Sequence, residues 1–141
     1  MQNIKNKAGL SLVEILVAVF IFSIVFLATL EALKYSSFLV SSQEQTAIAN
    51  SILTEVAEDI LLLDYASVNV GNMSANYNSG GSKEPDKLKD LNDSSITVSV
   101  SDADSDVGTN LKKIIITVTW TGPYGKASSP KSATIYRSRP K

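Results

Sequence analysis

Apolar residues run almost without interruption from residue 10 to residue 30, and Glu14 is the one charged residue among them. A helix rises about 1.5 Å per residue, so a helix of this length matches a hydrocarbon core of roughly 30 Å. Lys5 and Lys7 precede the run. The positive-inside rule therefore places that end in the cytoplasm and the rest of the chain outside. The pattern predicts one membrane-spanning helix over residues 10–30.

The same helix is predicted to continue as an amphipathic segment over residues 31–64. No Pro or Gly occurs between residues 10 and 70, so no residue in this stretch is expected to break the helix. Isoleucine or valine recurs at every fourth position from Ile48 to Ile60, and polar side chains fill most of the other faces. We expect a head domain to pack on this apolar stripe.

Residues 65–141 are predicted to form a loop followed by a small antiparallel sheet. The stretch 64–93 is rich in Asn, Gly and Ser, which is typical of a long exposed loop that is either functional or mobile. Alternating or β-branched patterns predict three strands, at residues 96–100, 113–120 and 133–136. Turn-rich connections favour a meander, with Trp120 as a packing anchor between sheet and helix. The expected fold class is α+β, a long N-terminal helix packed on this sheet.

Composition excludes several classes of function. The chain of 141 residues has no cysteine and no histidine, which removes disulfides, thiol nucleophiles, histidine bases and the usual zinc ligands. No phosphate-binding loop occurs, and the sequence does not identify a pair of carboxylates that the fold would bring together for catalysis. We therefore expect that the chain is not an enzyme and binds no cofactor. A net charge of −1 without a basic stripe gives little support to nucleic-acid binding.

Glu14 needs an explanation of its own. A carboxylate in hydrocarbon is costly and is usually retained for a function. It stands at the fifth position after a short basic leader that ends in Ala8-Gly9. This arrangement resembles the class III leader of type IV pilins and pseudopilins, in which a basic leader ends in Gly and Glu is the fifth mature residue.

The resemblance implies a leader over residues 1–9, cleaved after Gly9 by a prepilin peptidase, and N-methylation of the new N-terminus, Leu10, by the same peptidase/methyltransferase. It implies a type IV pilin-like fold and assembly with other pilins or pseudopilins on an inner-membrane platform. Glu14 would accept a salt bridge from the Leu10 ammonium of a neighbouring subunit. In a low dielectric such a pair selects register more than it adds stability.

The location implied by the resemblance is the bacterial inner membrane. The chain would cross it once, with the N-terminus in the cytoplasm and the head outside. After assembly it would lie in a pilus or pseudopilus, in the periplasm or at the cell surface. Removing Lys5 and Lys7 with the leader would leave 11 basic side chains against 14 acidic ones.

Two departures from the major pilins refine the expectation. Major pilins usually carry Gly and Pro within the helix, and here Glu31 stands where such a Pro is often found. Many relatives also close the C-terminal region with a disulfide, which this chain cannot form. The chain is more similar to V-type minor pilins and to the I-type pseudopilin of type II secretion. The segment Thr117-Val118-Thr119-Trp120, with the turn and strand that follow it, also resembles the C-terminal half of these proteins. We expect a minor structural subunit.

Two alternatives stay open. The first is a pseudopilin of a type II secretion system, which the adjacent genes would distinguish from a pilus or competence subunit. The second is a membrane-anchored or secreted binding module whose leader is cut by ordinary signal peptidase. Against this second alternative, the apolar run exceeds the usual 7–15 residues and no clear A-x-A site follows it. Sequencing of the mature N-terminus would decide.

Asp102, Asp104 and Asp106 are the candidate metal ligands. An EF-hand loop that began at Asp102 would need Gly at its sixth position and Glu at its twelfth. Val107 and Lys113 stand there, so that motif is excluded. Some major pseudopilins hold calcium near their C-terminus, which keeps a different calcium loop as an alternative. We expect a solvated Asp-rich connection without a metal.

Overall fold

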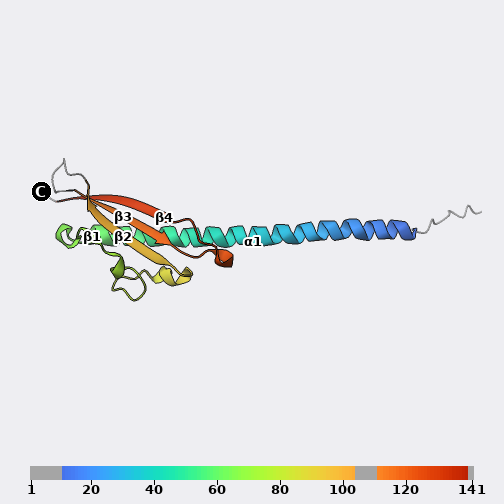
Figure 1. Cartoon of the computed structure of the whole chain (residues 1–141), viewed down its shortest axis with the longest axis horizontal. Coiled ribbons are helices and arrows are strands. Elements are labelled where there is room, and N and C mark those ends of the chain that lie inside the picture. The colour runs from blue at the N-terminus through green and yellow to red at the C-terminus, as the bar shows by residue number, and fades with distance from the viewer. Residues whose placement is uncertain (1–10, 104–110, 140–141) are drawn as a thin grey trace, which may run out of the picture. The chain divides into compact units, whose positions relative to one another are not determined.

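The computed structural model describes residues 11–103 and 111–139. Its regular elements are one long helix, α1 (Leu12–Leu62), and four strands, β1 (Gly71–Asn72), β2 (Ser95–Asp102), β3 (Leu111–Thr119) and β4 (Lys131–Ser138), shown in Figure 1. The connections contain four short 3-10 helices, η1 (Tyr65–Ser67), η2 (Ser74–Asn76), η3 (Asp86–Asp90) and η4 (Pro123–Gly125). The chain divides into two compact units, Met1–Leu39 and Val40–Lys141, and the boundary falls within α1.

The first unit contains the apolar part of α1, whose side chains are exposed. The most apolar window of α1 has a mean hydropathy of 2.7 with none of its residues buried. Within the described residues, α1 alone is long and apolar enough to cross a membrane. The hydroxyls of Ser23 and Thr29 each donate to the backbone carbonyl four residues earlier, at 2.8 Å. These polar groups are thus satisfied inside the helix, as a lipid environment requires.

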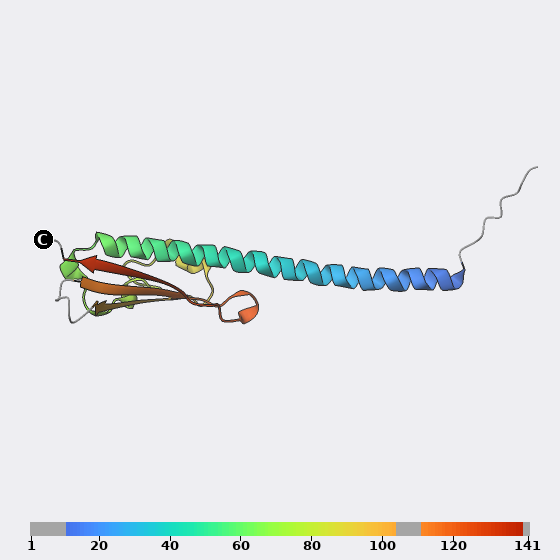
Figure 2. The same cartoon turned by 90° about the horizontal axis from the view of Figure 1, so that it is seen from above.

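In the second unit, α1 packs against one face of the sheet, and Figure 2 shows the two layers. The predicted stripe supplies Ile52, Val56 and Ile60, each at most 1% exposed, and Ala49 and Leu53 join them in the core. The sheet contributes the inward-facing side chains of its two central strands: Ile96, Val98, Val100, Ile114, Ile116 and Val118. The prediction of a head packed on the stripe is confirmed.

The four strands form a meander in the order β1-β2-β3-β4, with every neighbouring pair antiparallel. Val98 lies opposite Ile116, and Ile116 lies opposite Ala133. Side chains therefore alternate between a core face and a polar outer face, as in a one-sided antiparallel sheet. The three predicted strands correspond to β2, β3 and β4, although Trp120 falls one residue beyond β3.

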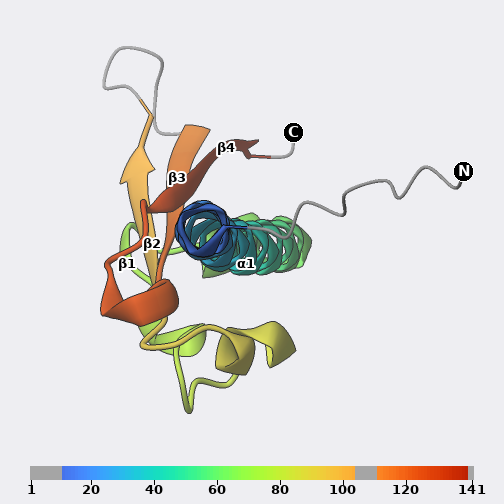
Figure 3. The same cartoon turned by 90° about the vertical axis from the view of Figure 1, so that its right-hand side faces the viewer.

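The prediction for residues 64–93 is corrected in part. This segment holds a fourth strand, β1, together with η1, η2 and η3, and it is not simply an exposed loop. Four of its apolar side chains are buried in the core: Val68, Tyr77, Leu88 and Leu91. Each of them anchors the segment separately, without the regular spacing that marks a helix or strand in a sequence. Figure 3, a view along α1, shows the sheet on one side of the helix and η3 on an adjacent side.

Polar side chains attach this segment to the edge of β2. The Asn78 side chain accepts the N–H of Ile96 at 2.7 Å and donates to the carbonyl of Ile96 at 2.8 Å. The Ser74 hydroxyl accepts the N–H of Val98 at 2.8 Å. Asn78 and Ser74 thus replace a neighbouring strand, and the exposed edge that would otherwise invite aggregation is covered.

Candidate functional site

The N-terminal end of α1 carries the candidate assembly residue, Glu14. Ser11 precedes the first helical residue, and its hydroxyl accepts the N–H of Glu14 at 3.3 Å. The Ser11 carbonyl accepts the N–H of Ile15 at 3.2 Å. Ser11 is therefore the N-cap and Glu14 the third helical residue, the two positions of a Ser-x-x-Glu capping box. The sequence prediction missed this cap, although its signature is present in residues 11–14.

The carboxylate of Glu14 is exposed in the first turn of α1. A negative charge is favourable there, because it faces the positive end of the helix dipole. Within residues 11–103 and 111–139 the one ion pair joins Lys83 and Asp59, so Glu14 has no ionic partner in this part of the chain. The predicted cleavage and methylation residues, Gly9 and Leu10, lie outside the described residues.

Of the three candidate metal ligands, one lies within the described residues. Asp102 is the last residue of β2, is exposed, and pairs in register with Lys112. Asp104 and Asp106 lie outside the described residues. Within the described part of the chain, no group of three or more His, Cys, Asp or Glu side chains is arranged to hold a metal ion.

A polar cluster on the second unit ties the segment after α1 back to the helix. It lines a surface cavity of about 260 Å³. Lys83 Nζ lies 2.8 Å and 3.0 Å from the two carboxylate oxygens of Asp59, and the Tyr77 hydroxyl donates to Asp59 at 2.8 Å. Burial would raise the pKa of Asp59, but the hydrogen bonds from Lys83 and Tyr77 and the charge of Lys83 outweigh it and lower the pKa. Burial, and then the hydrogen bond to Asp59, raise the pKa of Tyr77.

Asp59→Asn is expected to reduce stability in a pH-dependent way. Because the pKa of Asp59 is lowered in the fold, its ionisation stabilises the native state above the usual carboxyl pKa, and this contribution is lost as the pH falls. The stability difference between the wild type and Asp59→Asn should be largest near neutral pH and should vanish in acid. Urea unfolding of the second unit between about pH 3 and 7 would measure it. Glu58→Gln, an exposed neighbour, is the control, and an equal pH dependence in both variants would contradict the assignment.

Basic side chains from the sheet close the C-terminal end of α1. The Arg137 guanidinium donates to the backbone carbonyls of Ile60 and Leu63. Lys112 donates to the carbonyl of Tyr65 at 2.9 Å and to that of Val68, and its ammonium lies 4.2 Å from the centroid of the Tyr65 ring. The last turn of α1 has no basic residue of its own. Arg137 and Lys112 therefore satisfy carbonyls that would otherwise lack a partner at and beyond this helix end.

Trp120 joins the other end of the sheet to the helix. It is 6% exposed, and its indole Nε1–H donates to the side-chain oxygen of Gln45 at 3.3 Å. This confirms its predicted role as a packing anchor between sheet and helix.

Comparison with known families agrees with the N-terminal geometry. Residues 4–30 match the family model described as the prokaryotic N-terminal methylation motif. The match covers Gly9, Leu10, Glu14 and the first part of α1, and it does not extend into the second unit. No curated protein and no solved structure matches the chain. The chain thus carries the methylation motif at its N-terminus, and its one long helix packed on a small four-stranded antiparallel sheet is a pilin-like fold.

Proposed function

We propose that the chain is a minor structural subunit that is cleaved after Gly9, N-methylated at Leu10 and assembled into a type IV pilus or pseudopilus. The match of residues 4–30 to the methylation motif carries this proposal. The motif points to a structural subunit and not to an enzyme. The unbroken course of α1 from Leu12 to Leu62 supports a minor subunit, because major pilins usually have Gly or Pro in this helix.

Before assembly, the apolar part of α1 would anchor the subunit in the bacterial inner membrane, with the head outside. Prepilin peptidase would remove the leader at the cytoplasmic face. Transfer of the helix from lipid into a helical bundle brings no net hydrophobic gain, because lipid tails are as apolar as the helix surface. Close packing and polar pairs must therefore specify how the subunits align.

The polar pair in this proposal joins Glu14 to the N-terminal ammonium of Leu10 in a neighbouring subunit. The two residues are four positions apart, so a neighbour displaced along the helix axis by about 6 Å would bring the two groups to the same level. The Glu14 backbone is already fixed by the Ser11 cap, which limits the orientations available to the carboxylate. The cap thus supports a defined register.

The uninterrupted α1 also fits a pseudopilin of a type II secretion system. The two machines differ in their partners, and the adjacent genes would separate them. A membrane-anchored or secreted binding module remains the alternative of a different class. It would be released by ordinary signal peptidase and would have a different mature N-terminus.

Gly9→Val is expected to block maturation, because a small and flexible residue is needed at a junction cut at the membrane surface. The mature protein from cells that contain a prepilin peptidase should begin with methylated Leu10, and the Gly9→Val protein should keep residues 1–9. Mass spectrometry of the N-terminal peptide measures both. Ala18→Val, the same side chain placed within α1, should mature normally. A mature protein that begins at another residue would overturn the proposal.

A further inference from the structure

The connection between β3 and β4 contains a turn, η4, at which Tyr124 is exposed. The N–H of Gly122 donates to the carbonyl of Lys126 at 2.7 Å, and the N–H of Gly125 donates to the carbonyl of Gly122 at 3.2 Å. Tyr124 has φ 63° and ψ 27°, a left-handed conformation that favours glycine. Tyr124 is also 81% exposed. A large aromatic side chain is thus displayed where glycine would relieve the strain, which suggests a functional reason for it.

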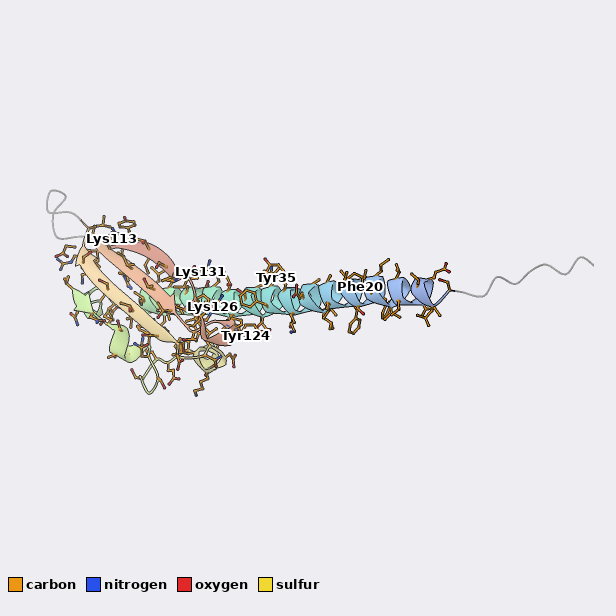
Figure 4. All side chains as sticks on the ribbon, turned by 45° about the vertical axis from the view of Figure 1, so that its right-hand side comes forward. Phe20, Tyr35, Lys113, Tyr124, Lys126 and Lys131 are labelled. Atoms are coloured by element: carbon orange, nitrogen blue, oxygen red, sulfur yellow. The ribbon has the colours of Figure 1, made fainter. Side chains whose placement is uncertain are left out.

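The turn lies at the end of the second unit where α1 enters it. Trp120, just before the turn, is hydrogen-bonded to Gln45, and a Cβ atom at Gly122 would lie 3.8 Å from the same Gln45 side-chain oxygen. Gln45 lies within two helical turns of Val40, the first residue of this unit. Figure 4 shows Tyr124 and Lys126 at the end of the unit opposite to Lys113. From this end the chain continues directly into the apolar part of α1.

The charges on the connection itself are positive. The sequence contains no Asp or Glu from residue 111 to residue 139, and the connection carries Lys126 and Lys131. Two exposed acidic residues lie near the connection: Glu44, on the same helical turn as Gln45, and Asp93, which follows Asn92, whose carbonyl accepts the N–H of Thr121 at 2.8 Å. Tyrosine is enriched at membrane–water interfaces, where its amphipathic ring lies at the level of the headgroups. The ring occupies the interface, and the ammonium groups reach anionic phosphates.

We propose that, before assembly, this turn rests on the anionic headgroups of the membrane that holds the subunit. The Tyr124 ring lies among the headgroups, while Lys126 and Lys131 contact lipid phosphates. The proposal rests on the proposed function in one respect, the anchoring of α1 in a membrane. Its consequence is that the unassembled head is held at the membrane surface, and assembly releases the turn from the lipid.

The absence of cysteine from the chain permits a direct test. The full chain carries one cysteine, introduced at exposed Ala127 and labelled with a fluorophore, and is reconstituted in vesicles that contain lipids with headgroup quenchers. One set of vesicles is phosphatidylcholine, and in the other about a third of the lipid is phosphatidylglycerol. Ser101→Cys is the control, because Ser101 pairs with Lys113 at the opposite end of the unit.

We expect the label at residue 127 to be quenched about twofold more than the label at residue 101 in the anionic vesicles. Molar salt should remove this excess, because it screens charges beyond about 3 Å. Lys126→Glu with Lys131→Glu should also reduce it to the control level. So should Tyr124→Gly, which suits the left-handed conformation and preserves the turn.

Three results would overturn the inference: equal quenching at both sites, no effect of these substitutions, or quenching that follows the protein-to-lipid ratio instead of the lipid charge. The last would show that the turn binds a second copy. Flotation of the same samples separates the two proposals. Chains that float with the vesicles without excess quenching at residue 127 refute the docking alone, whereas chains that do not float refute the membrane anchoring.

Discussion

Glu14→Ala is expected to leave the subunit in the membrane and to remove it from sheared pili or pseudopili. In the bundle, the substitution would leave the Leu10 ammonium of the neighbouring subunit, whose ordinary pKa is about 7.7–8.0, without a counter-charge. Breaking a buried pair in this way costs about 3–5 kcal/mol, so incorporation should fall about a hundredfold or more. Immunoblots of the sheared and the membrane fractions measure the two pools.

A graded series makes this test more specific. Glu14→Asp should be partly defective, because its carboxylate is one methylene shorter. Glu14→Gln keeps the size and loses the charge, so it should behave like Glu14→Ala if the charge is what matters. Cleavage and membrane insertion should persist in all three. Normal incorporation of Glu14→Ala would show that the carboxylate has no role in assembly.

Ile52→Ala is expected to cause a large loss of stability in the second unit. Ile52 is fully buried between α1 and the sheet. Truncation of a buried isoleucine leaves a cavity and costs about 2–5 kcal/mol. Urea unfolding of a fragment that contains residues 40–141 would measure it, since these residues form a compact unit with their own core. Leu62→Ala is the control on the same helix, because Leu62 is 85% exposed and its loss should change stability by less than about 0.5 kcal/mol.

This experiment also tests whether the second unit folds alone. The wild-type fragment should be soluble and should unfold in one cooperative transition. An aggregated fragment, or one without a cooperative transition, would contradict the picture of a helix covered by a sheet. Equal destabilisation by Ile52→Ala and Leu62→Ala would contradict the assignment of the core.

Repeating patterns explain why the helix and three strands were predictable. The stripe from Ile48 to Ile60 keeps one period over several turns, and its polar faces are equally regular. The β-branched run in β3 has no helical period. The N-terminal motif could also be recognised from the sequence, because its leader, glycine and glutamate lie close together in the chain.

The remaining features depend on contacts between distant residues. β1 has two residues, too few for any periodicity, and it is defined by its pairing with Ser99 and Val100. Asn78 contacts β2 through side-chain hydrogen bonds that replace strand pairing. The conformation of Tyr124 depends on hydrogen bonds across the turn, and tyrosine itself favours no left-handed turn.

The hydrogen bonds from Arg137 to the C-terminal end of α1 can form only late in the synthesis of the chain. Arg137 follows Ile60 by 77 residues, so it leaves the ribosome after the rest of the sheet. By then the apolar part of α1 has long been available for insertion into the membrane. The helix end stays open until β4 arrives and pairs with β3. In the proposed topology, proteases and chaperones outside the cytoplasm would meet an anchored chain with an unfinished head until β4 is complete.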